Sequence, residues 1–138
     1  MTKITLTDIH LASAYYPILV EVARHKSRVT YGELVQRARA RYPDRQVVQR
    51  AIAVSTGRRL DVVRAFTSDR GYPDLSSLVV SRGSGECGVG FTRSFDPVAV
   101  REAVYAFDWS DVATDFEGFV KFTEKGATPR KSVSEPVA

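Results

Sequence analysis

Apolar residues recur every three or four positions near the N-terminus, which is the spacing of one face of an α-helix. They are Ile9, Ala12, Tyr16, Leu19, Val20 and Ala23. Thr7 or Asp8 is a suitable N-cap, whereas Pro17 is the weak point because proline lacks the N–H that a helix interior needs. The pattern predicts an amphipathic helix that starts late or bends.

A second helix is predicted over residues 31–40. Thr30-Tyr31-Gly32-Glu33 has the spacing of a capping box, in which the Thr hydroxyl accepts from the backbone of the Glu and the Glu carboxylate reaches back to the cap. Asp44 can cap a third helix over residues 45–54, which Thr56-Gly57 breaks.

A fourth helix is expected over residues 58–68, because it would bury Leu60, Val63 and Phe66 and then stop at Gly71 and Pro73.

The periodicity changes after Pro73. Residues 75–80 are typical of a strand, residues 82–86 of a turn and residues 89–91 of a returning strand, which together predict a β-hairpin.

Asp96-Pro97 is an N-cap followed by proline at the first helical position, and it opens a helix that ends at residues 107–110. A last short helix is expected over residues 111–122. From Lys125 the chain is small, polar and proline-containing, which is typical of a disordered tail.

This order of elements predicts an α+β fold, a mainly helical winged helix-turn-helix with a two-stranded β-hairpin wing and a C-terminal helical extension. One winged-helix-like domain would occupy residues 1–124 and the disordered tail residues 125–138. The length of 138 residues agrees with one domain.

The distribution of charge along the chain indicates a class of binding partner. The whole chain has a net charge of +4, but residues 24–70 contain twelve basic against four acidic residues, a local net charge of +8. Clustered cations displace the counterions that condense on phosphates, so this distribution is typical of a nucleic-acid-binding segment. The alternative is a coding bias, because fifteen of the twenty basic residues are arginine, as GC-rich coding produces without any binding role.

In a helix-turn-helix, the third helix would enter the major groove and the wing would touch an adjacent groove. The residues expected to face the groove are Arg45, Gln46, Gln49 and Arg50, and those expected near phosphates are Arg58, Arg59 and Arg82. The same alternation of apolar and polar residues also describes any amphipathic surface helix.

Several short motifs resemble the DNA-binding half of O6-alkylguanine alkyltransferases and of the non-catalytic alkyltransferase-like proteins. They are Thr30-Tyr31-Gly32-Glu33-Leu34, Arg50-Ala51-Ile52-Ala53, the Leu75 to Val80 segment, and the glycines that lead to Phe91. The resemblance implies that Tyr31 helps to rotate a nucleotide out of the stack and that Arg50 fills the gap. The alternative is that Tyr31 is an aromatic residue in the first turn of the helix and packs on the hairpin.

Ser76 and Ser77 stand where that family has its alkyl-accepting Cys and the neighbouring His. A serine hydroxyl without a base does not supply the thiolate that alkyl transfer needs, so we expect no repair activity. The whole arrangement, from Tyr16-Pro17 to the Gly88 to Phe91 close, also resembles a group of short prokaryotic and phage-type proteins without an established activity.

Other chemistry is weakly indicated. The single Cys87 has no evident catalytic partner, the turn at residues 82–88 lacks the Gly-Lys-Ser/Thr of a P-loop, and the two histidines are far apart, so neither a metal nor another cofactor is expected. No apolar run reaches the length of a membrane span, which predicts a cytoplasmic protein without a membrane partner.

We therefore expect a non-enzymatic DNA-binding protein whose partner is duplex DNA. The alternative is a phage or mobile-element module that binds a host protein or a second copy of itself. This alternative is based on the acidic, aromatic-rich stretch over residues 107–122, where Trp109 would be a core or interface anchor.

Overall fold

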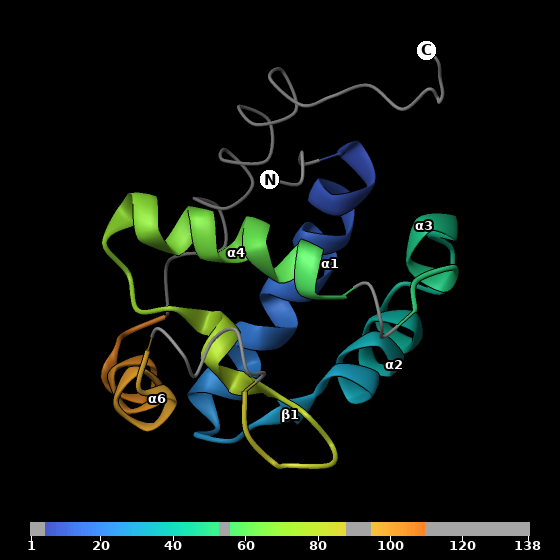
Figure 1. Cartoon of the computed structure of the whole chain (residues 1–138). Helices are drawn as coiled ribbons and strands as arrows, with labels where there is room; N and C mark the ends of the chain where they lie inside the picture. Colours follow the sequence, from blue (N-terminus) through green and yellow to red (C-terminus); the bar gives the residue numbers. More distant parts are fainter. Residues whose placement is uncertain (1–4, 53–55, 88–94, 110–138) are drawn as a thin grey trace.

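The computed structural model describes residues 5–52, 56–87 and 95–109. The first helix, α1 (Leu6–Arg24), lies at the centre, and twelve of its nineteen residues are buried. Helix α4 (Thr56–Arg70) crosses α1, while α2 (Tyr31–Arg41) and α3 (Gln46–Gln49) lie to one side and α6 (Pro97–Ala106) to the other (Figure 1). A helix that is apolar on most sides belongs in the middle of a bundle, so α1 is the core element and not an amphipathic surface helix.

Helix α1 begins earlier than its apolar spacing predicts. Its N-cap is Thr5, whose hydroxyl accepts from the backbone N–H of Asp8 at 3.2 Å, while the Asp8 carboxylate accepts from the Thr5 backbone N–H at 3.1 Å. The predicted cap at Thr7 or Asp8 is therefore wrong, because Asp8 is the third residue of a capping box. The helix continues through Pro17 to Arg24.

Three of the predicted helix signals are confirmed. The capping box joins Thr30 and Glu33 at the start of α2, with bonds of 2.9 and 3.1 Å. The carboxylate of Asp96 caps α6 with Pro97 in the first helical position. Gly71 follows the last residue of α4 with φ of +74°, a conformation that glycine adopts without a steric penalty.

The third helix is much shorter than predicted. Helix α3 contains only Gln46–Gln49, its N-cap is Arg45 in place of Asp44, and Thr56 and Gly57 begin α4 and do not break a helix. The side chain of Gln49 donates to the carbonyl oxygens of Arg39 and Tyr42, so α3 is held against the end of α2 as a single turn.

The predicted hairpin is wrong. Residues 75–78 form a 3-10 helix, η2 (Leu75–Leu78), capped by Asp74, and only β2 (Val79–Val80) is a strand. It pairs in parallel with β1 (Val29–Thr30), in the register Val29 with Val79. Both residues of β2 are buried, and a strand buried on both faces is typical of parallel pairing.

The chain is thus mainly helical with a small parallel two-stranded sheet, an α+β arrangement. The expected returning strand over residues 89–91, the helix over 111–122 and the tail over 125–138 lie outside the described residues. No helix in the described ranges has the length and hydropathy to cross a membrane.

Candidate nucleic-acid interface

Three arginines reach solvent from neighbouring parts of the fold. Arg37 lies on α2, Arg50 is the C-cap of α3, and Arg82 lies in the loop of residues 81–87, which follows β2. All three are exposed, and none makes a side-chain hydrogen bond or an ion pair with another residue in the described ranges. Arg37 and Arg82 both lower the pKa of the Glu33 carboxyl, after the larger effect of its hydrogen bonds to Thr30. These three guanidinium groups are cations that the described part of the fold leaves available to an anion.

Two other predicted groove residues hold the fold together. Arg45 donates to the carbonyl of His10 at 3.3 Å and lies 5.2 Å from the centre of the Tyr42 ring, so it ties α3 to α1. The Gln49 amide binds the two backbone carbonyls at the end of α2. A base contact by Gln49 would require these two bonds to break. Gln46, by contrast, is exposed on α3.

Arg59 is committed to the core. Its guanidinium lies 3.1 Å from the carboxylate of Asp8, and the side chains of Arg59 and Asp8 are 13% and 2% exposed. Arg59 thereby joins α4 to the capping box of α1, and it is not displayed with Arg50 and Arg82. The neighbouring Arg58 is in the first turn of α4, and its side chain lies outside the described part of the structure.

Tyr31 and Arg82, which are 51 positions apart in the sequence, line one cleft. The cleft has a volume of about 630 Å³, and α2 supplies most of its wall together with Ser81 from the loop. Tyr31 is half-buried, and this burial raises the pKa of its hydroxyl, so the side chain stays neutral at physiological pH. The sequence-predicted site residues whose side chains are described therefore separate into a pair at this cleft, a pair at α3 and its C-cap (Gln46 and Arg50), and structural residues.

A second cleft of about 470 Å³ lies on the other side of the start of α2. Lys26, Arg28 and Tyr105 line it, and it shares Thr30 and Glu33 with the first cleft. Arg28 donates to the carbonyl of Gly85 at 3.2 Å, which connects this cleft to the loop of residues 81–87. The sequence had placed Lys26 and Arg28 in the basic segment without a role.

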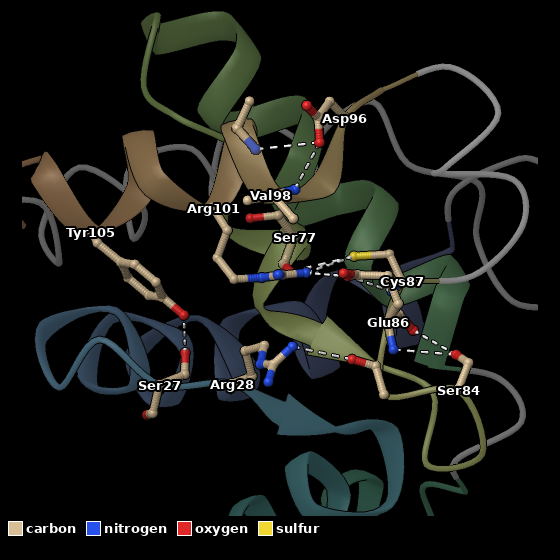
Figure 2. Close-up of polar contacts among 12 residues, drawn as sticks. Ser27, Arg28, Ser77, Ser84, Glu86, Cys87, Asp96, Val98, Arg101 and Tyr105 are labelled. Carbon is tan, nitrogen blue, oxygen red and sulfur yellow. Dashed lines mark hydrogen bonds and ion pairs between the residues drawn. The ribbon is translucent and has the colours of Figure 1, made fainter.

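The base of the loop is held by a buried arginine that the sequence did not single out. Figure 2 shows Arg101 of α6 between Ser77, Glu86 and Cys87. Its guanidinium donates to the Ser77 carbonyl at 2.9 Å, pairs with the Glu86 carboxylate and lies 3.6 Å from the Cys87 sulfur. One feature of the sequence could have identified Arg101. It precedes Val104 by three residues, so it places a charge on the apolar face of a helix.

Cys87 is a buried residue of this cluster. Burial raises the pKa of its thiol, and Arg101 opposes this shift without cancelling it. The thiol donates to the carbonyl of Ser77 at 3.4 Å. A protonated, enclosed thiol is a poor nucleophile.

The two serines at the alkyl-acceptor positions are also buried. The Ser76 hydroxyl donates to Asp74 at 2.7 Å, which makes it part of the cap of η2. In the described residues, no group of three or more His, Cys, Asp and Glu side chains could hold a metal ion.

Comparison of the chain with protein-family models, with curated proteins and with solved structures gave no match. A functional assignment therefore depends on the geometry of the site alone.

Proposed function

We propose that the protein binds duplex DNA without catalysing a reaction, and that Arg37, Arg50 and Arg82 are its phosphate and groove contacts. The observation that supports this proposal is the difference among the basic residues. These three arginines are exposed and have no protein partner in the described ranges, whereas Arg41 pairs with Glu21 at 2.5 Å and Arg59 with buried Asp8. Solvated guanidinium groups that form no ion pair with a carboxylate are available to displace counterions from DNA.

The binding mode in the proposal is that of a helix-turn-helix. Helix α2, the short connection from Tyr42 to Arg45, and α3 would be the helix-turn-helix pair, and the loop of residues 81–87 would contact the adjacent backbone as a wing does. Gln46 and Arg50 are four residues apart and both exposed, so they are the base-reading pair among the four residues expected to face the groove. Arg would read guanine and Gln adenine, each good contact contributing about 1 to 3 kcal/mol of discrimination.

The first test is a fluorescence-anisotropy titration of a labelled duplex over a salt series. The affinity of the unmodified protein should fall steeply between about 50 and 200 mM salt, because log K falls by roughly 0.9 per contacted phosphate for each log unit of salt. Arg37→Ala and Arg82→Ala should each make this slope shallower by about 1 and weaken binding to all sequences alike. Arg50→Ala should in addition change the preferred sequence in a random duplex pool.

Arg70→Ala is the matched control, because Arg70 is an exposed arginine at the far end of α4 that pairs with Asp69. It should leave both the slope and the preference unchanged. No binding at low salt would overturn the proposal, as would an equal loss in all four variants. If the unmodified protein binds no DNA but recovers a host polypeptide from nuclease-treated lysate, the alternative of a protein-interaction module would be favoured instead.

A further inference from the structure

Two neighbouring clefts flank the start of α2, and Thr30 and Glu33 line both of them. We call the two clefts together the α2 groove. Lys26 and Arg28 lie in one half and Arg82 in the other, and Glu33 is the only carboxylate among the residues that line the described walls. The lining therefore has three cations against one anion, and it also offers the polar side chains of Gln36 and Ser81.

An aromatic side chain lines each half of the α2 groove. Tyr31 belongs to the larger half and Tyr105 to the smaller, where its hydroxyl donates to the carbonyl of Ser27 at 2.9 Å (Figure 2). This bond holds the Tyr105 ring at the rim between α6 and the end of α1. A cationic groove with aromatic side chains is the arrangement that binds unpaired nucleotides, whose phosphates follow the cations and whose bases stack on the rings.

The size of the groove favours one strand over two. Its halves of about 630 and 470 Å³ each fall within the range of roughly 300 to 1,000 Å³ that is typical of small-ligand sites. Such a space holds individual nucleotides, whereas a duplex would have to lie on the surface outside it. The groove is thus separate from Arg50, while Arg82 belongs both to the groove and to the proposed duplex contacts.

Lys26 provides an independent observation. It has φ of +51°, the left-handed conformation, directly after the C-cap of α1. The N–H of Lys26 bonds to the Ala23 carbonyl and that of Ser27 to the Val22 carbonyl, the hydrogen bonds of a Schellman motif.

Helix α4 ends in the same motif, and there the left-handed residue is Gly71. Glycine would relieve the steric strain at position 26 as well. A lysine that occupies this position, exposed and at the groove, points to a use for its ammonium group.

From these observations we propose that the α2 groove binds a single-stranded nucleic-acid segment, with its phosphates on Lys26, Arg28 and Arg82. This inference rests on the proposed function, since it makes unpaired nucleotides a second ligand of the same protein. An opened or single-stranded stretch beside a duplex would occupy the groove and the Arg50 surface together.

The test compares a labelled oligothymidylate with a labelled duplex, using the full chain and its Lys26→Gly and Lys26→Arg variants. Lys26→Gly should raise the Tm by about 2 to 5 °C, because it removes the left-handed strain. The same variant should weaken oligothymidylate binding about five- to tenfold at low salt and reduce the salt slope by roughly 0.7, the single-strand value per phosphate. Lys26→Arg should restore the affinity.

Duplex binding is the internal control. Lys26→Gly should leave duplex affinity unchanged, whereas Arg50→Ala should weaken duplex binding and leave oligothymidylate binding intact. Lys26→Gln keeps most of the stem without the charge and gives the same answer if the glycine variant does not fold. Two results would overturn the single-strand inference and leave the proposed duplex binding in place. One is unchanged oligothymidylate affinity in both Lys26→Gly and Lys26→Gln, and the other is duplex binding without any single-strand binding. Failure of the unmodified protein to bind either probe would instead overturn the proposed function.

Discussion

Arg50 and Arg59 are nine residues apart in the sequence, but the structure exposes one and pairs the other. Arg50 is exposed at the end of α3, and Arg59 is paired with Asp8, which is 2% exposed. Asp8 also accepts the Thr5 backbone N–H of the capping box, so one carboxylate serves the helix cap and the ion pair. Removing the arginine would take a charged partner away from this buried carboxylate.

We therefore predict that Arg59→Ala lowers the free energy of unfolding by about 3 to 5 kcal/mol, the usual cost of breaking a buried pair. Arg50→Ala should change it by less than about 0.5 kcal/mol, since it removes an exposed side chain without a described partner. Urea unfolding followed by circular dichroism measures both values. A cost below about 1 kcal/mol for Arg59→Ala would contradict the pairing and make Arg59 available to phosphate again.

At the scale of elements, the loop of residues 81–87 is the piece that connects the two halves of the α2 groove. The loop carries Arg82, and its base is held to α6 through the pair of Glu86 and Arg101 and through Cys87 (Figure 2). The Cys87 backbone N–H donates to the Glu86 carboxylate at 2.9 Å. Because Cys87 is buried beneath this pair, its thiol reports on opening of the loop.

We predict that Glu86→Gln increases the rate at which 4,4′-dithiodipyridine modifies Cys87 by about tenfold, because a hydrogen bond to a charged group contributes roughly 1.5 to 3 kcal/mol. Glu102→Gln is the matched control, since Glu102 is exposed on the same helix beside Arg101. The control should react at the rate of the unmodified protein. Equal rates in all three proteins would show that the pair does not hold the loop.

Acid should open the same loop. Arg101 holds the pKa of the Glu86 carboxyl below its ordinary value of 4.5. A carboxyl whose pKa is lowered in the folded state stabilises that state above its unfolded pKa, and the stabilisation is lost as the pH falls through the folded pKa. The rate of Cys87 modification, corrected for the intrinsic reactivity of the thiol, should therefore rise below about pH 4.5 in the unmodified protein and not in Glu86→Gln.

At the scale of the whole molecule, α1 connects the helices that the structure describes. It packs against α2, α3, α4, η2 and α6, and its last residue, Arg24, donates to the carbonyl of Trp109 at 2.9 Å. Trp109 is 3% exposed and packs on the rings of Tyr72 and Phe107. The sequence allowed two roles for Trp109, a core anchor or an interface anchor. Its burial in the structure makes it a core anchor.

Because Trp109 shares one core with α1, we predict that the chain from α1 to α6 unfolds in a single transition. The fluorescence of Trp109, the only tryptophan, should have the same urea midpoint as the far-ultraviolet circular dichroism signal. An earlier fluorescence midpoint would show that α6 and the segment to Trp109 separate from the rest before α1 unfolds.

The sequence alone determined the features that depend on neighbours three or four residues apart. The capping box of Thr30 and Glu33, the Asp96-Pro97 start of α6 and the Gly71 stop of α4 are all local, so their residue types predict them directly. The concentration of basic residues in the middle of the chain is likewise a property of the sequence and needs no knowledge of the fold. These signals suffice for a mainly helical protein with a candidate anion-binding segment.

Only the tertiary structure decided which elements meet and which charges remain available. The valines of β2 are compatible with either a hairpin or a parallel strand, and the position of β1, fifty residues earlier, selects the parallel pairing. Arg59 and Arg101 differ from Arg50 and Arg82 only because buried carboxylates or carbonyls face the first two. Pairing of strands and of charges depends on residues that are distant in sequence, and local periodicity does not predict such partners.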